Sequence, residues 1–279
     1  MKSPSMIEDQ SASGGSITSR ARRRFIALLG TGAAATATGA LSLGVSRMGH
    51  AAPRPHIKAI AFDGLAVFDP RPIAALTESL FPGKGPALTN AWRTRQFEYT
   101  WLRTITNTYV DFWQVTDEAL TFAAELLKLK LSTQKRSRLM HAFLTIAAWP
   151  DAVPVLKDLK ARGVSLALLA DFTGTMMDAC VKNSGLDGVF ESHLSTDRVK
   201  AYKPDPRAYE MAMHEFGLTR DEIAFVAFAG WDAAGARAFG YQTFWANRLG
   251  LPPEDLGFAA NEMRRTFTDL PMFISRNRA

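Results

Sequence analysis

The stretch at residues 57–69, IKAIAFDGLAVFD, decides the fold that we expect for this chain. Its first half is a short apolar run with β-branched residues, which is typical of a buried parallel strand. Asp63 comes directly after this run, and Gly64 marks the end of the strand. Ligands of open α/β sheets bind at the carboxyl ends of the strands, so Asp63 is a candidate active-site residue. Many strands also end in Asp as a turn or helix-cap residue, so the rest of the chain must decide between these roles.

Residues 150–279 alternate between predicted helices and predicted strands. The strands are expected at 164–170, 189–194, 222–229 and 242–246. The helices are expected at 151–162, 173–184, 206–216, 233–239 and 269–275. This repetition, joined to the first strand, predicts a doubly wound, Rossmann-like α/β core whose parallel sheet is covered on both faces.

Residues 70–149 show no convincing strand. Apolar residues at three- and four-residue spacing predict helices at 71–81, 87–108, 116–129 and 133–147. Breaks are expected at 82–83 and 111–112. We therefore expect a helical cap at 70–149, inserted into a core formed by 52–69 and 150–279.

The charge of the chain is concentrated at its N-terminus. The formal net charge is +6 over 279 residues, and residues 1–51 contribute +4 of it with six basic and two acidic side chains. The remaining residues are nearly balanced, so the composition does not support nucleic-acid binding. The hydrophobic content of 47% is ample for a buried core.

The N-terminal segment resembles a twin-arginine export signal. Arg22-Arg23-Arg24-Phe25-Ile26 precedes an uncharged stretch rich in Ala, Gly and Thr, and small residues near Ala51 form a plausible cleavage box. The alternative is a membrane anchor, because the stretch is just long enough to span a bilayer. Its Gly and Thr content favours a cleaved signal at 1–51. We expect export by the twin-arginine machinery to the periplasm.

Cys180 is the only cysteine, so the chain can form no internal disulfide. A catalytic thiol is an alternative, but its place in the middle of a predicted helix favours a small buried residue.

Four polar residues fall at or just after predicted strand ends: Asp63, Asp171, Lys203 and Asp232. The loops that carry them converge at one edge of a parallel sheet. A lysine fixed beside a carboxylate favours the anion, which is the form that attacks as a nucleophile. Each residue also has a structural reading, as a turn residue, a surface charge or a helix cap. Their joint placement favours an active site.

Four motifs in this order resemble the type II (L-2-) haloacid dehalogenases, part of the wider haloacid dehalogenase-like superfamily. They are Asp63 after the first strand, WRTRQFEYTWLR, YKPDPRAYE and GWDAAGARAFGYQTFWANR. The resemblance covers residues 57–250. It implies a hydrolase that needs no metal and no cofactor, acts on a small-molecule substrate, and forms a homodimer through cap helices.

The resemblance also implies roles for individual residues. Asp63 would attack the halogen-bearing carbon of a short 2-haloalkanoate and form an ester that water then hydrolyses. Lys203 would hold the nucleophile, and Asp232 would position it and the water. Arg93 would receive the departing halide, a role suited to a fixed cation. Tyr209 would belong to the same network.

Phe97, Phe112 and Trp231 match the apolar pocket of the family, which would exclude water and enclose the carbon chain. The alternative is ordinary packing between cap and core, above all for Phe112. Asp171 stands where the family has Asn and would lie at the substrate.

The chain also departs from the family pattern. The loop after Asp63 lacks the Gly-Thr pair of the family and is one residue shorter. Ala170 replaces a Ser, and Ala227 and Ala229 replace a Ser and an Asn that ordinarily hold the substrate or the water. Each lost donor to a charged group costs about 1.5–3 kcal/mol. We therefore expect a divergent member of the family.

Two other functions stay open at this point. A phosphatase of the same fold needs a second Asp two residues after the nucleophile, where this chain has Leu65, and a Mg²⁺ ion that Asp63, Asp171 and Asp232 could hold. A catalytically impaired binding protein would explain the lost polar residues. Retention of Asp63, Arg93, Lys203 and Asp232 together favours the dehalogenase.

Overall fold

The computed structural model describes residues 56–277, which belong to one compact unit, residues 50–279. The predicted signal peptide at residues 1–51 lies outside the described residues. None of the helices found in the described range combines the length and the apolar character needed to cross a membrane.

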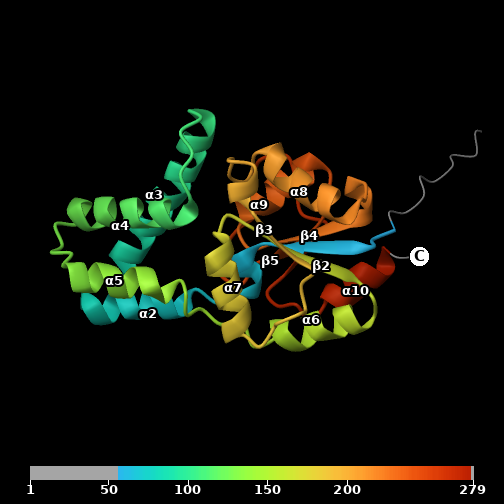
Figure 1. The fold of residues 1–279 in the computed structure, drawn as a ribbon, viewed down its shortest axis with the longest axis horizontal. Helices are drawn as coiled ribbons and strands as arrows, with labels where there is room; N and C mark the ends of the chain where they lie inside the picture. Colours follow the sequence, from blue (N-terminus) through green and yellow to red (C-terminus); the bar gives the residue numbers. More distant parts are fainter. Residues whose placement is uncertain (1–55, 278–279) are drawn as a thin grey trace, which may run out of the picture. The chain divides into compact units, whose positions relative to one another are not determined.

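A parallel sheet of six strands forms the centre of the described chain (Figure 1). Its strands are β1 (Ala59–Phe62), β2 (Ser165–Ala170), β3 (Ser192–Ser195), β4 (Ile223–Ala227), β5 (Gln242–Ala246) and β6 (Glu262–Arg264). The order across the sheet is β3-β2-β1-β4-β5-β6, and every neighbouring pair is parallel. The prediction of a doubly wound α/β core is confirmed.

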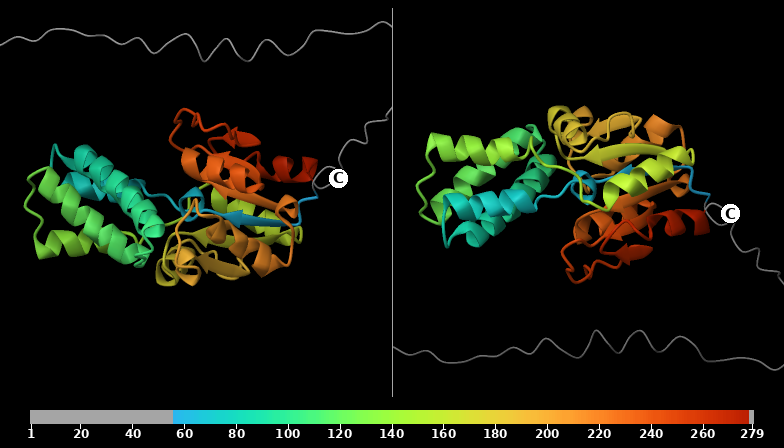
Figure 2. Two further views of the ribbon diagram at one scale, coloured as in Figure 1. Left: turned by 90° about the horizontal axis from the view of Figure 1, so that it is seen from above. Right: turned by 90° about the horizontal axis from the view of Figure 1, so that it is seen from below.

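Helices cover both faces of the sheet (Figure 2). They are α6 (Ala152–Ala161), α7 (Gly174–Asn183), α8 (Pro206–Phe216), α9 (Gly230–Phe239) and α10 (Leu270–Arg276). Side chains alternate along β1, so that Ile60 and Phe62 join the hydrophobic cluster that contains α6, α7 and α10. Ala59 and Ala61 join the cluster on the other face, which contains α8 and α9. The near-continuous apolar run of β1 follows from burial on both faces.

The strand order reverses at β1, because β2 and β3 lie on one side of it and β4, β5 and β6 on the other. The loops that follow β1 and β4 therefore run to opposite faces and leave a crevice between them. This switch point places the residue after β1, Asp63, opposite the start of α9.

A helical insertion, which we define as α2–α5, lies between β1 and β2 in the chain. Its helices are α2 (Arg71–Leu80), α3 (Gly85–Ile105), α4 (Phe112–Leu126) and α5 (Thr133–Ala142). The helix α4 begins four residues earlier than the expected residue 116. The reason is Asp111, whose carboxylate accepts a hydrogen bond from the backbone N–H of Gln114 and caps the helix.

The two segments that join the insertion to the core are hydrogen-bonded to each other. Phe68 and Ala148 form an antiparallel bridge. The backbone N–H of Asp69 donates to the Ala147 carbonyl, and that of Trp149 to the Val67 carbonyl. The Trp149 indole also donates to the Leu65 carbonyl over 3.0 Å. The insertion is thus anchored immediately beside the loop that follows Asp63.

Four short elements lie outside the predicted pattern: α1 (Gly64–Val67), β6 and the 3₁₀ helices η1 (Thr196–Arg198) and η2 (Arg220–Glu222). Cys180 on α7 is fully buried, as the sequence predicts, and burial raises the pKa of its thiol to about 12. A thiol that stays protonated at neutral pH is a poor nucleophile, so Cys180 is a packing residue.

Candidate active site

Three core loops bring a lysine and two carboxylates into contact at the carboxyl edge of the sheet. Asp63 follows β1, Lys203 precedes α8, and Asp232 lies in the first turn of α9. The Nζ atom of Lys203 lies 2.7 Å from Oδ2 of Asp63 and 2.7 Å from Oδ2 of Asp232. A single ammonium group therefore bridges the two carboxylates.

Backbone groups fix the second oxygen of Asp63. Oδ1 accepts hydrogen bonds from the backbone N–H of Leu65 at 2.9 Å and of Ala66 at 3.3 Å, so Asp63 is the N-cap of α1. The side chain remains 16% exposed, whereas that of Lys203 is 1% exposed. Asp63 therefore caps α1 with one carboxylate oxygen, while its side chain stays partly exposed.

The ammonium of Lys203 remains charged although it is buried. Burial alone lowers the pKa of Lys203, but attraction to Asp232, Asp63 and Asp171 outweighs it and raises the pKa above its usual value. The ammonium therefore supplies a fixed positive charge between the two carboxylates.

Asp232 is held from two sides. Its Oδ2 accepts from Lys203, and its Oδ1 accepts from the Tyr209 hydroxyl at 2.8 Å. Burial raises the pKa of Asp232 to about 6, against the opposing effect of Lys203. Tyr209 is fully buried, and burial together with the Asp232 charge raises the pKa of its hydroxyl well above the usual range. The phenol therefore acts only as a donor to Asp232.

Asp171 lies at the end of β2 and adds a third carboxyl group to the site. Its Oδ1 accepts one hydrogen bond, from the backbone N–H of Lys203 at 3.3 Å. Burial raises its pKa to about 7, Lys203 opposes this, and the charges of Asp232 and Asp63 add to it. The carboxyl of Asp171 therefore titrates near neutral pH.

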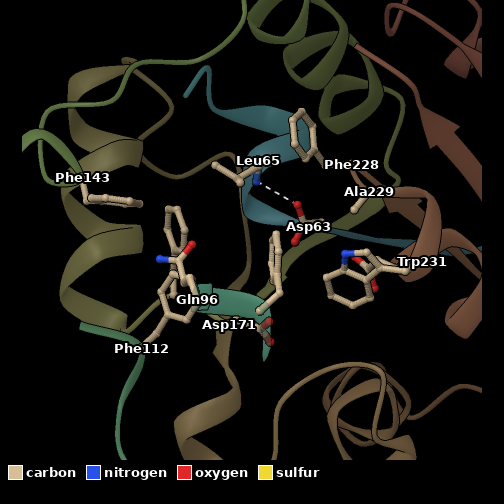
Figure 3. Close-up of a pocket in the computed structure, with 12 residues that line it drawn as sticks. Asp63, Leu65, Gln96, Phe112, Phe143, Asp171, Phe228, Ala229 and Trp231 are labelled. Carbon is tan, nitrogen blue, oxygen red and sulfur yellow. Dashed lines mark hydrogen bonds between the residues drawn. The ribbon is translucent and has the colours of Figure 1, made fainter. Parts of the chain in front are cut away.

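A small cavity of about 30 Å³, which we call the reaction cavity, adjoins these acids. Its lining residues come from both the core and the insertion: Asp63, Leu65, Gln96, Phe97, Phe112, Phe143, Asp171, Phe172, Phe228, Ala229, Trp231 and Asp232. Figure 3 shows Gln96 and Phe112 across this space from Asp63 and Trp231. The insertion therefore covers the space beside these acids and limits the access of bulk water, which strengthens the electrostatic interactions at Asp63.

The predicted aromatic residues meet at the boundary between insertion and core. The rings of Phe97 and Trp231 pack edge to face with centroids 5.2 Å apart, and those of Phe112 and Phe172 are tilted with centroids 5.6 Å apart. Phe112 also belongs to the hydrophobic core cluster. Phe112 therefore both packs in the core and lines the reaction cavity.

Arg93 on α3 stands beside the reaction cavity and does not line it. Its guanidinium carbon lies 5.2 Å from the centroid of Phe228 and 5.7 Å from that of Phe97. Burial lowers the pKa of Arg93, and the charge of Asp63 opposes this. Among residues 56–277 it forms no hydrogen bond or ion pair, so its charge is available to an anion.

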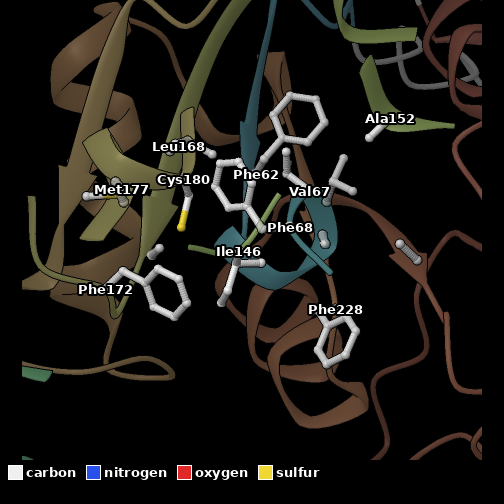
Figure 4. Packing of buried hydrophobic residues seen from close by; sticks show 14 of the residues in the cluster. Phe62, Val67, Phe68, Ile146, Ala152, Leu168, Phe172, Met177, Cys180 and Phe228 are labelled. Atoms are coloured by element: carbon white, nitrogen blue, oxygen red, sulfur yellow. The ribbon is translucent and has the colours of Figure 1, made fainter. Parts of the chain in front are cut away.

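The sequence did not identify several residues that line the cavity: Gln96, Phe143, Phe172 and Phe228. It singled out Leu65 only as the position where a phosphatase would have its second Asp. Gln96 lies within the motif WRTRQFEY, which is the one signal that could have identified it. Its side-chain amide donates to the Thr116 hydroxyl at 2.6 Å, which ties the Gln96 side chain on α3 to α4. Figure 4 shows Phe172 and Phe228 within the core packing, so apolar character alone does not mark them as lining residues.

The three alanines at residues 170, 227 and 229 supply no side-chain hydrogen-bond donors to the site. Ala170 and Ala227 are buried at the ends of β2 and β4, and Ala229 lines the reaction cavity. A methyl group on Gly64 would lie 3.3 Å from the Ala170 side chain, so the short loop after Asp63 packs directly against this position. A side chain larger than that of Ala170 would therefore crowd this loop.

Within residues 56–277, no group of three or more His, Cys, Asp or Glu side chains is arranged to hold a metal ion. The ammonium of Lys203 lies between the two carboxylates that would otherwise be the first candidates.

Comparison with known sequences identifies the relatives of this chain. A family model described as haloacid dehalogenase-like hydrolase matches residues 23–240. The chain is 42% identical over 203 residues to an (S)-2-haloacid dehalogenase of Pseudomonas sp. (strain YL), covering 72% of this chain and 88% of that protein. It is 38% identical to haloacetate dehalogenase H-2 of Moraxella sp. (strain B), covering 72% of this chain and 90% of that protein.

Solved structures agree with the sequence comparison. The L-2-haloacid dehalogenase of Xanthobacter autotrophicus, solved with chloropropionic acid covalently bound, matches with a TM-score of 0.72 and 30% identity over 78% of this chain and 98% of that one. Another L-2-haloacid dehalogenase matches with a TM-score of 0.77 and 40% identity over 79% of this chain and 99% of that one.

Proposed function

The chain belongs to the haloacid dehalogenase-like hydrolases, and on this premise we propose that it hydrolyses the carbon–halogen bond of short (S)-2-haloalkanoic acids. The observation that carries the proposal is the Lys203 ammonium shared at 2.7 Å by Asp63 and Asp232, beside an apolar cavity. Lysine supplies the fixed positive charge that an attacking carboxylate needs. The activities of the relatives point to the same reaction.

In the first step, a carboxylate oxygen of Asp63 attacks the halogen-bearing carbon. A carbon–oxygen bond forms while the carbon–halogen bond breaks, and the halide leaves with its electron pair. Backbone N–H groups and Lys203 hold the Asp63 carboxylate in one orientation, which favours a near-attack geometry. The Arg93 guanidinium has no partner within residues 56–277 and accepts the developing negative charge of the halide.

In the second step, water attacks the carbonyl carbon of the Asp63 ester. Asp232 takes a proton from the water and returns it to the alkyl oxygen as the bond between that oxygen and the carbonyl carbon breaks. The products are a 2-hydroxy acid and the Asp63 carboxyl group, which then loses its proton to solvent. A pKa of about 6 for Asp232 suits a base that works near neutral pH. Tyr209 keeps Asp232 oriented through its 2.8 Å hydrogen bond.

We also infer that the chain is a divergent member of its family. The alanines at 170, 227 and 229 supply no side-chain donors, and Asp171 adds a titratable acid where the family has an amide. The substrate carboxylate must therefore rely more on backbone N–H groups and on the protonation state of Asp171.

The test is halide release from (S)-2-chloropropionate and monochloroacetate by the mature chain. We expect turnover by the wild type and none by Asp63→Asn, because an amide is a poor nucleophile. A single turnover in ¹⁸O-labelled water should place ¹⁸O in the Asp63 carboxylate, as detected by peptide mass spectrometry.

Two outcomes would favour the other functions. Hydrolysis of p-nitrophenyl phosphate that depends on Mg²⁺, without halide release, would indicate the phosphatase. No turnover of either substrate, with wild type and Asp63→Asn behaving alike, would indicate a binding protein.

We further propose that the chain is exported by the twin-arginine machinery and cleaved near Ala51. Support comes from Arg22, Arg23 and Arg24 before an uncharged stretch that ends in small residues. Replacing Arg22 and Arg23 together by Lys should leave the precursor in the cytoplasm, while the wild type is found in the periplasm with a new N-terminus. Equal distribution of both forms between the compartments would refute export by this route.

We also propose that two copies of this chain form a homodimer through helices of the insertion. Its support is the family resemblance together with apolar side chains that the insertion exposes, including Leu102 at 54% and Ile105 at 81%.

A further inference from the structure

The carboxyl group of Asp171 carries one oxygen that the described chain leaves without a partner. Asp171 follows β2, is 7% exposed and lines the reaction cavity (Figure 3). Its Oδ1 accepts a hydrogen bond from the backbone N–H of Lys203 at 3.3 Å. Within residues 56–277 its Oδ2 forms no hydrogen bond or ion pair, because the Lys203 ammonium contacts Asp63 and Asp232 instead. A buried acceptor of this kind gains from a donor on a molecule that enters the cavity.

The reaction cavity carries an excess of negative groups. Among the described residues that line it, three are aspartates and none is a lysine or an arginine. The Lys203 ammonium contacts both Asp63 and Asp232, so its single charge cannot balance the two of them. Arg93 stands beside the cavity, and of these acids it is Asp63 whose charge acts on it. A third ionised carboxyl, that of Asp171, therefore makes the cavity unfavourable for a further anion.

The other groups that face Asp171 supply neither a donor nor a balancing charge. The Tyr202 hydroxyl donates to the Val110 carbonyl at 2.6 Å, and the Tyr209 hydroxyl donates to Asp232 at 2.8 Å. Burial raises the pKa of both phenols above the usual value, so both stay neutral. The helices α3 and α4 line the cavity only with uncharged side chains, namely Gln96, Phe97 and Phe112.

This arrangement distinguishes between a substrate carboxylate and a substrate amide. The two groups are planar and of nearly equal size, so a cavity that admits one also admits the other. A carboxylate offers only acceptors, so it gains a hydrogen bond from Asp171 only when Asp171 is protonated. A primary amide is neutral and offers two N–H donors, one of which can donate to the ionised carboxylate in a charge-assisted hydrogen bond.

We propose that the site also removes halide from neutral 2-haloalkanamides, with the ionised Asp171 carboxylate accepting a hydrogen bond from the amide nitrogen of the substrate. The proposal rests on the function proposed above, because the same Asp63 carboxylate attacks. An oxygen of Asp63 forms a bond to the halogen-bearing carbon, and the halide leaves with its electron pair. Water then hydrolyses the Asp63 ester, so the product is a 2-hydroxyalkanamide. The carbon–nitrogen bond of the amide stays intact.

Acid and amide substrates should therefore show opposite pH dependences. Ionised Asp171 favours the amide, protonated Asp171 favours the acid, and the pKa of this carboxyl is about 7. Between about pH 6 and pH 8 the ionised fraction rises about ten-fold and the protonated fraction falls about ten-fold. The ratio of kcat/KM for (S)-2-chloropropionamide to that for (S)-2-chloropropionate should thus rise by about ten-fold to a hundred-fold. Titration of Asp232, which serves both substrates, cancels in this ratio.

Halide release by the mature chain measures the ratio, with Asp63→Asn as the blank for uncatalysed release. No turnover of the amide by a protein that releases halide from the acid would overturn the inference and leave the proposed function intact. A ratio that rises less than about three-fold between pH 6 and pH 8 would overturn it as well.

Asp171→Asn tests the carboxyl group itself. Asn keeps the shape of Asp and cannot ionise, so the ratio should no longer depend on pH. At pH 8 it should fall about ten-fold, because the amide loses a charge-assisted hydrogen bond and the acid loses a repulsive charge. Asp187→Asn is the matched control, because Asp187 is exposed and does not line the cavity, and it should match the wild type. A wild-type pH dependence in Asp171→Asn would contradict the proposal.

Calorimetry with unreactive ligands separates this inference from the proposed function. Propionamide and propionate lack a halogen, so their binding does not depend on catalysis. The preference of the wild type for propionamide over propionate should be at least about ten-fold greater at pH 8 than at pH 6, and that of Asp171→Asn should be equal at both. This pattern without halide release from either substrate would refute the dehalogenase alone. A wild-type preference that does not change with pH would refute the role of Asp171, whether or not the acid is dehalogenated.

Discussion

Asp171 is the acid whose ionisation should control how stability responds to pH. Its pKa is about 7 in the folded chain because the carboxyl is buried, against about 3.9 in an unfolded chain. The unfolded state therefore releases this proton above about pH 4, while the folded state keeps it up to about pH 7. The free energy of unfolding consequently falls as the pH rises through this window and stays low above it.

We predict that Asp171→Asn is more stable than the wild type at pH 8 by at least about 1 kcal/mol, with an upper bound on the order of 4 kcal/mol. The gain should shrink as the pH falls from 7 toward 4, because the wild-type carboxyl is then protonated as well. Urea unfolding at pH 5 and pH 8 measures this. Asp187→Asn, at an exposed position, should show no such gain. A gain that is the same at both pH values would contradict the assignment.

Lys203→Met should be the most damaging substitution at the site. Removing the ammonium leaves Asp63 and Asp232 close together without a counterion, which should cost about 3–5 kcal/mol of stability at pH 8. The loss should be smaller at pH 5, because Lys203 holds the pKa of Asp232 down and without it Asp232 protonates more readily. Halide release should fall about 10²–10³-fold or more.

Chemical denaturation at the two pH values and a halide assay test this prediction. The matched control is Lys157→Met, an exposed lysine on α6. If Lys203→Met were equally stable at both pH values, the buried triad of charges would not behave as described.

The three charged residues that contact one another at the site could be predicted, because parallel topology sends the carboxyl end of every strand to one edge of the sheet. Asp63, Lys203 and Asp232 each follow an apolar run or precede a helix, so their convergence needs no side-chain detail. The lining residues could not be predicted in the same way. Phe143 directly follows α5 and Phe172 lies in the loop after β2, and their apolar side chains are equally suited to the core.

At the scale of elements, the start of α4 connects a helix cap to the reaction cavity. Asp111 caps the helix, and the next residue, Phe112, lines the cavity. We predict that Asp111→Ala lowers the free energy of unfolding by about 1 kcal/mol. It should also raise KM more than it lowers kcat, because the first turn of α4 and the Phe112 ring lose their fixed position.

Urea unfolding and steady-state kinetics test the role of Asp111. Ser132→Ala is the control, since Ser132 caps α5 through Lys135 and lies at the other end of the insertion. It should lose similar stability and keep its KM. Equal KM values for Asp111→Ala and the wild type would mean that Phe112 is positioned by packing alone.

The pattern of residues predicted long elements better than short ones. The helix α8 and the strand β5 lie at the expected residues, because Pro206 starts the helix, Gly217 ends it, and β5 is a compact apolar run. By contrast, β6 has three residues and two of them are exposed, so it carries no apolar signal. The helix α1 is a single turn that exists because Asp63 caps it, and single turns leave no periodicity to read.

At the scale of the whole molecule, the insertion contacts the core on two sides of the reaction cavity. On one side lie the hydrogen-bonded segments around Phe68 and Ala148. On the other side, the Tyr109 hydroxyl donates to Asp197 at 2.8 Å, and the rings of Tyr109 and Tyr202 stack. Because a cavity of about 30 Å³ leaves little room for a haloacid, we expect binding to displace side chains that line the reaction cavity or to widen this junction.

The exposed apolar residues of the insertion lead to a prediction about assembly. Ile105 at the end of α3 is 81% exposed, and large exposed apolar surfaces mark sites of protein–protein contact. We predict that residues 52–279 form a dimer in solution and that Ile105→Glu shifts it to monomer by placing a charge in the interface. Leu256→Glu is the control, because Leu256 is 59% exposed in a core loop and should leave the dimer intact. Light scattering coupled to size-exclusion chromatography over a range of concentrations measures the mass. A monomeric wild type at every concentration, or a dimer that survives Ile105→Glu unchanged, would remove α3 from the interface.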